Sequence, residues 1–446
     1  MTAGTIRKQL NDSPTARWTV LFIVATAMMM GYFVNDVMSP LETMLEQPTS
    51  QGGLGWTPAD YGFFSGAGSF INVFLLMLFF SGIILDKMGI RFTGTLACSL
   101  MVTGTLVKYY AVATPPDGTL FGMPLSVITA SAGFAIFGVG YEMTGISVSK
   151  AMVRWFTGHE LAMAMGIQLA MARLGTAAAL SVSAPIARHF TLSAPLLLSL
   201  ALLIVGLLSF LVFCIMDRHL DSSHEPHKSD KPSDNEEFRW SDIGTTLRSS
   251  GFWLITLFCV LFYSAVSPFL KFSTKLMVMK YGVDPDIAGF FSSVAPFGTI
   301  LLTPLFGYVY DRYGRGVTLV ISGALLLTMV HFGFALPMHD SSMALILMVV
   351  LSIGYSMAPA ALWPCVPKII PLKCLGTAYS MIFFIQNFGR AVIPMLVGRA
   401  NEQDPTYTSS MLIFGCTALG AAAVAIAMLV VDRHKGYGLQ QPNMTK

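Results

Sequence analysis

Charged residues are scarce in this sequence. Asp, Glu, Lys and Arg make up 11% of its 446 residues, whereas hydrophobic residues make up 54%. A soluble domain carries about 25% charged residues, because its surface must face water. Together with a mean hydropathy of +0.65, the shortage of charge indicates that much of the outer surface faces hydrocarbon. A soluble enzyme is therefore excluded.

Several other signals are missing. The net charge of +3 is too small and too scattered to suggest a nucleic-acid partner. No phosphate-binding loop occurs, so direct coupling to ATP is not expected, and neither is any other cofactor. The six cysteines show no metal-ligand spacing and lie in or near apolar runs, which favours reduced packing residues; they are Cys98, Cys214, Cys259, Cys365, Cys374 and Cys416. No cleavable signal peptide is evident, and the first apolar run, from Trp18, is long enough to remain as an anchor.

Long apolar runs dominate what is present. A helix that spans a membrane needs about 20 mostly apolar residues, because lipid offers its backbone no hydrogen-bond partner. The sequence predicts an all-α membrane protein with twelve spans in two groups of six: 18–42, 60–85, 92–113, 122–148, 160–187 and 192–216, then 251–279, 287–310, 317–337, 342–367, 375–398 and 408–431.

Lys and Arg concentrate in alternate loops, which predicts the orientation. Arg17 precedes the first span, Arg154 follows the fourth and Arg433 follows the twelfth, whereas the intervening loops hold few basic residues. Both termini are therefore predicted to be cytoplasmic. The expected organisation is a tail, a first bundle, a linker, a second bundle and a tail, at 1–17, 18–216, 217–250, 251–431 and 432–446. The polar linker is read as a solvated connection, with a zinc or regulatory site as the alternative.

A short motif occurs once in each half. The first copy contains Gly82, Asp86, Lys87, Gly89 and Arg91, and the second contains Gly307, Asp311, Arg312, Gly314 and Arg315. Gly82 and Gly307 would permit close helix approach, whereas Gly89 and Gly314 would allow a tight turn. Each aspartate is expected to cap a helix or to pair with nearby bases. Gly82 and Gly307 are 225 positions apart, and so are Asp86 and Asp311; this separation is about half the chain.

This repeated loop resembles the signature of the major facilitator superfamily. The resemblance implies two six-helix bundles whose signature loops latch the cytoplasmic side when the protein faces outward. A second repeat, with Gln168 before Arg173 and Gln386 before Arg390, is consistent with this duplication, and both glutamines are candidate substrate contacts. Halves of this kind hold a solute site between them, near the middle of the membrane.

Ionisable residues inside spans are costly and usually face a cavity or one another. Glu142 lies twelve residues before Arg154, and Arg173 lies thirteen after Glu160. At a rise of 1.5 Å per residue, both lie roughly 18–20 Å from the cytoplasmic edge. Three readings stay open: a structural ion pair, a site where Arg173 holds a carboxylate and Glu142 an ammonium or proton, or a pair that opens for substrate.

Other residues extend this candidate site. Asp36 is expected at a cavity or gate, where Gly31 and Pro40 invite a break in the first span. Arg390 is a second candidate contact for an anion. Lys108, Lys271 and Lys275 lie near outer ends of spans, where lysines snorkel by default, with Lys271 the expected exception.

Aromatic residues and one histidine complete the set. Trp363 and Tyr263 are expected along the path, each close to a proline that could kink its helix, and Tyr355 is a further candidate. Packing is the alternative for each of them. His331 is read as a packing residue, with a proton relay as the alternative.

Several stretches are also similar to the lysosomal dipeptide transporter family of animals and its relatives. They include Gly138 to Glu142, Gln168 to Gly175, Leu362 to Pro364 and Leu375 to Gly389. The resemblance implies that an acid on span four and an arginine on span five hold the two ends of a dipeptide, at Glu142 and Arg173. Arg390 departs from the family, which is apolar there. The short polar tails suit a bacterial inner membrane.

The sequence thus predicts a multi-pass, monomeric secondary transporter for a small carboxylate-bearing solute. Dipeptides or amino-acid-like zwitterions are the favoured cargo. Glu142 or Asp36 is a candidate carrier of a coupling proton, and uniport is equally open. An organic-anion or sugar-acid exchanger with Arg173 and Arg390 as twin contacts remains an alternative, as does a non-transporting sensor or scaffold.

Overall fold

The computed structural model describes residues 13–156, 160–223, 247–370 and 375–442. The long helices of the first half are α1 (Pro14–Asp36), α5 (Met77–Ala113), α6 (Leu125–Phe156), α7 (Leu161–His189) and α8 (Ala194–Ser223). Its short elements are η2 (Ser39–Leu41), α2 (Glu42–Leu45), η3 (Thr49–Gln51), α3 (Pro58–Ala67), α4 (Phe70–Phe74) and a hairpin of β1 (Thr119–Leu120) and β2 (Met123–Pro124).

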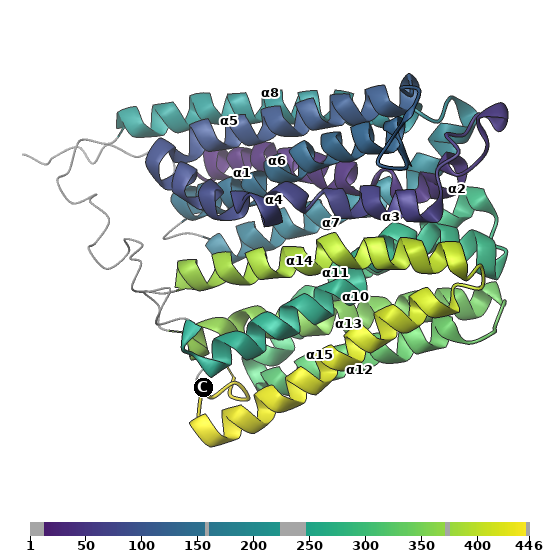
Figure 1. The fold of residues 1–446 in the computed structure, drawn as a ribbon. Helices are drawn as coiled ribbons and strands as arrows, with labels where there is room; N and C mark the ends of the chain where they lie inside the picture. Colours follow the sequence, from purple (N-terminus) through teal and green to yellow (C-terminus); the bar gives the residue numbers. More distant parts are fainter. Residues whose placement is uncertain (1–12, 157–159, 224–246, 371–374, 443–446) are drawn as a thin grey trace, which may run out of the picture.

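The second half is built from six long helices: α10 (Ser250–Tyr281), α11 (Pro285–Tyr313), α12 (Gly316–Ala335), α13 (Ser341–Ile369), α14 (Leu375–Gln403) and α15 (Thr408–Lys435). In Figure 1 the purple-to-teal helices form one bundle and the green-to-yellow helices form another beside it. The predicted all-α fold with two bundles is therefore confirmed.

The second predicted span, 60–85, is not one helix. It is divided among α3, α4 and the first part of α5, with breaks at Gly68–Ser69 and at Leu75–Leu76, where Leu76 has a positive φ of 53°. Eleven helices of the described ranges are long and apolar enough to cross a membrane, and this broken run lies where the sequence predicts the second of twelve spans. Helix α5 itself bends at Gly89, which has φ 79°.

Two further boundaries differ from the prediction. The expected break in span one occurs after Asp36, with Pro40 in η2, whereas Gly31 lies within unbroken α1. Helix α8 continues to Ser223, well past residue 216, so the start of the predicted linker is helical. The rest of that linker up to residue 246, with its histidines, lies outside the described residues.

The described residues begin and end on the same side of the bundles (Figure 1). Arg17 near the start of α1 pairs with Glu160 beside α7, and Lys435 at the end of α15 donates to Ser250 Oγ at 2.7 Å, at the start of α10. The distribution of Lys and Arg predicts that this side is cytoplasmic. We call it the predicted cytoplasmic side, and the opposite one the outer side.

The two halves approach most closely on the outer side. A Cβ added to Gly62 of α3 would lie 2.9 Å from Gly398 Cα of α14, and one added to Gly289 of α11 would lie 2.0 Å from the Leu180 carbonyl oxygen of α7. Such distances require glycine, because any side chain would separate the backbones. Polar contact adds to this closure, since Arg188 of α7 pairs with Asp286 of α11 at 2.6 Å.

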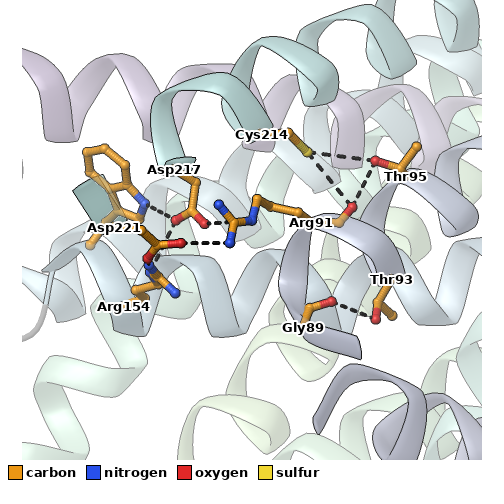
Figure 2. A network of polar contacts seen from close by, with 9 residues as sticks. Gly89, Arg91, Thr93, Thr95, Arg154, Cys214, Asp217 and Asp221 are labelled. Carbon is orange, nitrogen blue, oxygen red and sulfur yellow. Dashed lines mark hydrogen bonds and ion pairs between the residues drawn. The ribbon is translucent and has the colours of Figure 1, made fainter. Parts of the chain in front are cut away.

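The first signature loop binds helix α8. Figure 2 shows Arg91 and Arg154 converging on Asp217 and Asp221, with Arg91 Nη2 2.6 Å from Asp221 Oδ2 and Arg154 Nε 3.1 Å from Asp217 Oδ1. The indole of Trp155 donates to Asp217 Oδ1 at 3.1 Å. This network lies wholly within the first half and fixes the end of α8.

The four glycines of the two signature loops differ in backbone conformation and in the space around them. Gly89 and Gly314 have positive φ values of 79° and 74°, which confirms the predicted tight turns. The close helix approach expected at Gly82 and Gly307 is wrong for this conformation, because a Cβ at either would meet no described atom within 4 Å. Both glycines lie toward the predicted cytoplasmic side, whereas the halves close on the outer side.

Residues after α15 fold back onto the second loop. Arg315 N donates to Gln440 O at 2.7 Å, and Lys368 Nζ donates to Gln441 O at 2.9 Å. Leu439 is buried between these contacts, and its carbonyl accepts from Tyr310 at 3.3 Å. The side chain of Asp86 in the first loop lies outside the described residues.

Candidate functional site: a cavity between the two halves

A cavity of about 650 Å³ lies between the bundles. Helices α1, α3, α6 and α7 contribute one wall, and α10, α11, α13 and α14 contribute the other. Its lining extends from Asp36 and Lys271 on the outer side to Gly166 and Gly307 toward the predicted cytoplasmic side. The volume suits a small solute rather than a macromolecule.

Helix α7 presents one face to this cavity. Gly166, Leu169, Ala170, Arg173 and Thr176 all line it, at the three- and four-residue spacing that places side chains on one side of a helix. A run of small and apolar residues around Arg173 leaves room for its long side chain. Arg173 therefore faces the cavity, as the sequence predicted, whereas its depth in the membrane stays a prediction.

The Arg173 guanidinium is held by a tyrosine. Its Nη1 donates to the Tyr355 hydroxyl of α13 at 2.5 Å, and its Cζ lies 4.8 Å from the centre of the Tyr355 ring. Among the described residues, no carboxylate lies within ion-pair distance of Arg173. The guanidinium is therefore fixed in orientation by a neutral partner, while its charge is not matched by a protein anion.

Glu142 pairs with Arg390 rather than with Arg173. Arg390 Nη1 of α14 lies 2.7 Å from Glu142 Oε1 of α6, and both side chains are about four-fifths buried, at 22% and 19% exposure. The idea of a Glu142–Arg173 ion pair is thus wrong for this conformation. Spacing along two helices estimates depth correctly, but it does not reveal that α14 of the other half lies across the cavity.

A second ion pair joins the halves nearer the outer side. Lys271 Nζ of α10 lies 2.6 Å from Asp36 Oδ1 of α1 and also donates to the Asn35 carbonyl. The other Asp36 oxygen accepts from Thr176 at 2.9 Å. The break after Asp36 leaves the Asn35 carbonyl accessible to Lys271, as the predicted break in span one implied.

The charges that line the cavity do not cancel. Arg173, Arg390 and Lys271 supply three positive charges, and Glu142 and Asp36 supply two negative ones, which leaves one positive charge in excess. An unmatched charge away from bulk water is costly and attracts a counter-charge. The surplus corresponds to Arg173, the cation without a carboxylate partner in the described residues.

Aromatic and amide side chains complete the lining. Trp363 Nε1 donates to the Tyr263 hydroxyl at 3.2 Å, so the two predicted aromatics form one contact at the cavity wall. Gln386 also lines the cavity, and its Oε1 has no hydrogen-bond partner among the residues described. Gln168 was expected there too, but it is buried and donates to Met28 Sδ of α1 at 3.2 Å.

Two lysines differ from the snorkelling expectation. Lys108 is fully buried, donates to the Val34 carbonyl at 3.3 Å and lies 4.6 Å from the Phe137 ring centre. Lys275 is also buried and pairs with Glu42 at 3.2 Å and with Glu46. Each lysine finds its partners on neighbouring helices inside the protein, so neither needs to reach the membrane surface.

His331 lies inside the second bundle, as the packing interpretation expected. Its ring is 4.9 Å from that of Phe269 and 5.4 Å from that of Phe414.

The described residues contain no group of three or more His, Cys, Asp or Glu that could hold a metal.

Sequence reasoning missed four aromatic and polar residues of the site. Tyr32 and Tyr141 line the cavity with ring centres 5.0 Å apart, and Ser69 Oγ donates to Asn387 Oδ1 at 3.0 Å between the halves. The available signal was helical spacing, because Tyr32 precedes Asp36 by four residues and Tyr141 follows Gly138, another lining residue, by three.

Comparison with known proteins agrees with this architecture. A sequence model of the Major Facilitator Superfamily matches residues 21–394. The lysosomal dipeptide transporter MFSD1 of Danio rerio is 28% identical over 385 residues, covering 83% of this chain and 79% of its own. Its counterpart in Homo sapiens is 27% identical over 376 residues, with 82% and 77% covered.

Solved transporters share the fold. A peptide transporter, POT, solved in complex with alafosfalin, has a TM-score of 0.72 at 14% identity and covers 98% of this chain and 97% of its own. A D-xylose–proton symporter has a TM-score of 0.68 at 14% identity, with 92% and 97% covered. Since these proteins carry different solutes, the likeness establishes the fold alone.

Proposed function

Because this chain belongs to the Major Facilitator Superfamily, we propose that it moves a small carboxylate-bearing solute across the membrane by alternating access, with dipeptides or amino-acid-like zwitterions as its favoured cargo. The family makes it a multi-pass membrane transporter rather than an enzyme. The cargo is inferred from the chemistry of the cavity and from the relatives.

The observation that carries the proposal is the unmatched guanidinium of Arg173. It lines the cavity, is oriented by Tyr355 at 2.5 Å and has no carboxylate partner among the described residues. A guanidinium binds a carboxylate through two parallel hydrogen bonds, and this geometry is specific as well as strong. Arg173 would therefore hold the carboxylate of the solute.

The ammonium end of a zwitterion needs an acceptor. Glu142 provides one, since its side chain is 19% exposed and lines the cavity together with Arg173. An arriving ammonium would compete with Arg390 for Glu142, so the pair between α6 and α14 would open as cargo binds. The free Oε1 of Gln386 supplies a further acceptor, suited to a peptide N–H.

The named relatives support the same cargo. The curated proteins of 27–28% identity are named as dipeptide transporters. The stretches in which this sequence resembles that family include Glu142 and Arg173. Their lysosomal location does not transfer to this chain.

One observation favours a second candidate, an organic or sugar-acid anion. The cavity lining carries one surplus positive charge, and a monoanion would neutralise it, whereas a zwitterion would not. A dicarboxylate would exceed the surplus by one negative charge unless an acid of the lining, such as Glu142, took up a proton. The two candidates thus differ in whether the solute requires an ammonium.

The conformation fits alternating access. The outer side is closed by contacts such as Gly62 with Gly398, whereas the cavity lining reaches Gly307 toward the predicted cytoplasmic side. We infer an inward-facing arrangement. Outward opening would require the outer contacts between α3 and α14 and between α7 and α11 to separate.

Thermal unfolding of the purified protein in the presence of candidate solutes tests the proposal, with uptake into proteoliposomes as the second readout. Dipeptides should raise the midpoint and be accumulated. Arg173→Ala should lose both effects and keep its unliganded midpoint within a few degrees. Arg399→Ala, at an exposed arginine of α14, is the matched control and should behave like the unaltered protein.

The alternative results are equally definite. Stabilisation by organic acids and not by dipeptides would replace the first candidate with the second. Equal stabilisation of the Arg173→Ala variant by dipeptides would remove Arg173 from the site.

A further inference from the structure

A second polar cluster lies beyond the cavity, on the outer side. Lys275 of α10 contacts Glu42 at the start of α2 and Glu46 at its end, so that one base joins two acids across the boundary between the halves. Lys275 lies one helical turn from Lys271, which pairs with Asp36 in the cavity. The cluster therefore closes the outer end of the same interface.

Its charges cannot all be present without a cost. Glu42 is completely buried, Lys275 is 4% exposed and Glu46 is 19% exposed. If all three groups were ionised, the cluster would hold one unmatched negative charge away from water. Two carboxylates that share one site do not both ionise readily, because each opposes the other.

The second carboxylate oxygen of Glu42 indicates which of the two acids lacks a matching positive charge. Glu42 Oε1 faces Lys275 at 3.2 Å, but the buried Oε2 has no partner among the described residues. An ionised carboxylate would leave this oxygen both charged and desolvated. Glu46 is partly exposed and contacts Lys275 more closely, so it is the acid that Lys275 matches.

We propose that Glu42 is a proton-binding site of the outer gate: it takes up one proton from the outer solution as the gate closes around Lys275, and releases it when the gate opens. The proton adds to the Glu42 carboxylate, and Lys275 and Glu46 remain as a neutral ion pair. Closure of the outer side is thereby coupled to the pH of the outer solution.

Other titratable groups surround the cluster and could carry its proton instead of Glu42. Tyr61 of α3 and Tyr407 before α15 lie within electrostatic range of Glu42, Asp36 interacts with Tyr61, and Glu402 interacts with Glu46. The two phenols are neutral at ordinary pH. Asp36 is matched by Lys271 at 2.6 Å. Glu42 shares Lys275 with Glu46, so among the described residues of this cluster Glu42 is the acid without a base of its own.

The inference requires the alternating-access movement of the proposed function, but not its cargo. It is tested on the full chain without any solute, so failure here leaves the dipeptide proposal untouched. In a background without the native cysteines, spin labels at Phe121→Cys and Leu336→Cys report the separation of the halves, because both positions are exposed, at 90% and 51%, next to the outer ends of their helices.

The ratio of closed to open outer gate is measured by pulsed electron resonance between about pH 5 and pH 8. Uptake of one proton on closure raises this ratio up to about tenfold for each unit by which the pH falls. Glu42→Gln, which carries the neutral form permanently, should stay closed without this pH response. Glu46→Gln should also lose it, since Glu42 then pairs with Lys275 alone.

Asp117→Asn is the matched control, because it removes an exposed carboxylate from the outer loop between α5 and α6, away from the contacts that close the outer side. It should keep the response of the unaltered protein. A Glu42→Gln variant that still responds to pH like the unaltered protein would overturn the proposal, and so would loss of the response in Asp117→Asn. Replacement of sodium by choline at fixed pH should change nothing; a change would assign the site to sodium instead.

Discussion

Arg390 of α14 donates to Glu142 of α6 at 2.7 Å, and this ion pair connects the two halves of the molecule at the wall of the cavity. Both side chains remain partly accessible, at 22% and 19%. The pair can both stabilise the present conformation and take part in the transport movement. It matches charge in one conformation, and it separates when the halves move or when a solute competes for either partner.

A double-mutant cycle measures how strongly the two residues depend on each other. Glu142→Gln and Arg390→Gln should each lower the free energy of unfolding by about 1–3 kcal/mol, because each leaves a partly buried charge unmatched. The double variant should lose less than the sum of the two. Unfolding titrations of the four proteins check this, and additive losses would show that the pair contributes no coupling.

The glycine contact on the outer side should control which way the protein faces. A Cβ at Gly62 would lie 2.5 Å from the Pro394 carbonyl oxygen, so Gly62→Ala should hold α3 away from α14 and favour the outward-facing state. Gly82→Ala is the matched control, since a Cβ there meets no described atom within 4 Å.

Solute uptake and outer accessibility report the effect. Gly62→Ala should reduce uptake at least tenfold and expose outer residues of α3 to a water-soluble thiol reagent after cysteine substitution. Gly82→Ala should leave both unchanged. Equal behaviour of the two variants would mean that α3 and α14 tolerate separation without a change of state.

The network at the first signature loop predicts an unequal contribution from its two acids. Asp217 is 1% exposed and accepts from Trp155, whereas Asp221 is 43% exposed. Asp217→Ala should lower the free energy of unfolding by about 2–4 kcal/mol, because it strands buried donors. Asp221→Ala should lower it by less than about 1 kcal/mol, as expected for an exposed ion pair.

Thermal or denaturant unfolding of the two variants decides between them. Raising the salt concentration should weaken the contribution of Asp221 more than that of Asp217, since exposed pairs are screened. Equal losses for the two variants would mean that burial does not govern this network.

Much of the fold could be predicted from the sequence, because lipid imposes a simple rule on helix length. Runs of apolar residues gave the long helices, and the repeated loop gave the two related halves. The break at Leu76 could not be read in this way, since the residues around it are as apolar as those of an unbroken helix. The helical continuation of α8 past residue 216 was missed for a different reason, because residues 217–223 are mostly polar and resemble the linker that follows.

The site was predictable in depth but not in pairing. Counting residues placed Glu142 and Arg173 at one level, and both line the cavity. Their partners, Arg390 and Tyr355, come from helices of the other half, and no spacing within a helix encodes which helix lies across a cavity. Lys275 was misjudged for the same reason: its position suggested snorkelling, whereas α2 supplies two acids beside it.

The account depends most on Arg173 as the group that holds a solute carboxylate. The most direct measurement compares binding of a dipeptide with that of the same dipeptide bearing a C-terminal amide, by calorimetry on the purified protein. Loss of the carboxylate should weaken binding at least a hundredfold in the unaltered protein, and Arg173→Ala should bind both compounds equally weakly. Equal affinity of the two compounds for the unaltered protein would contradict the account.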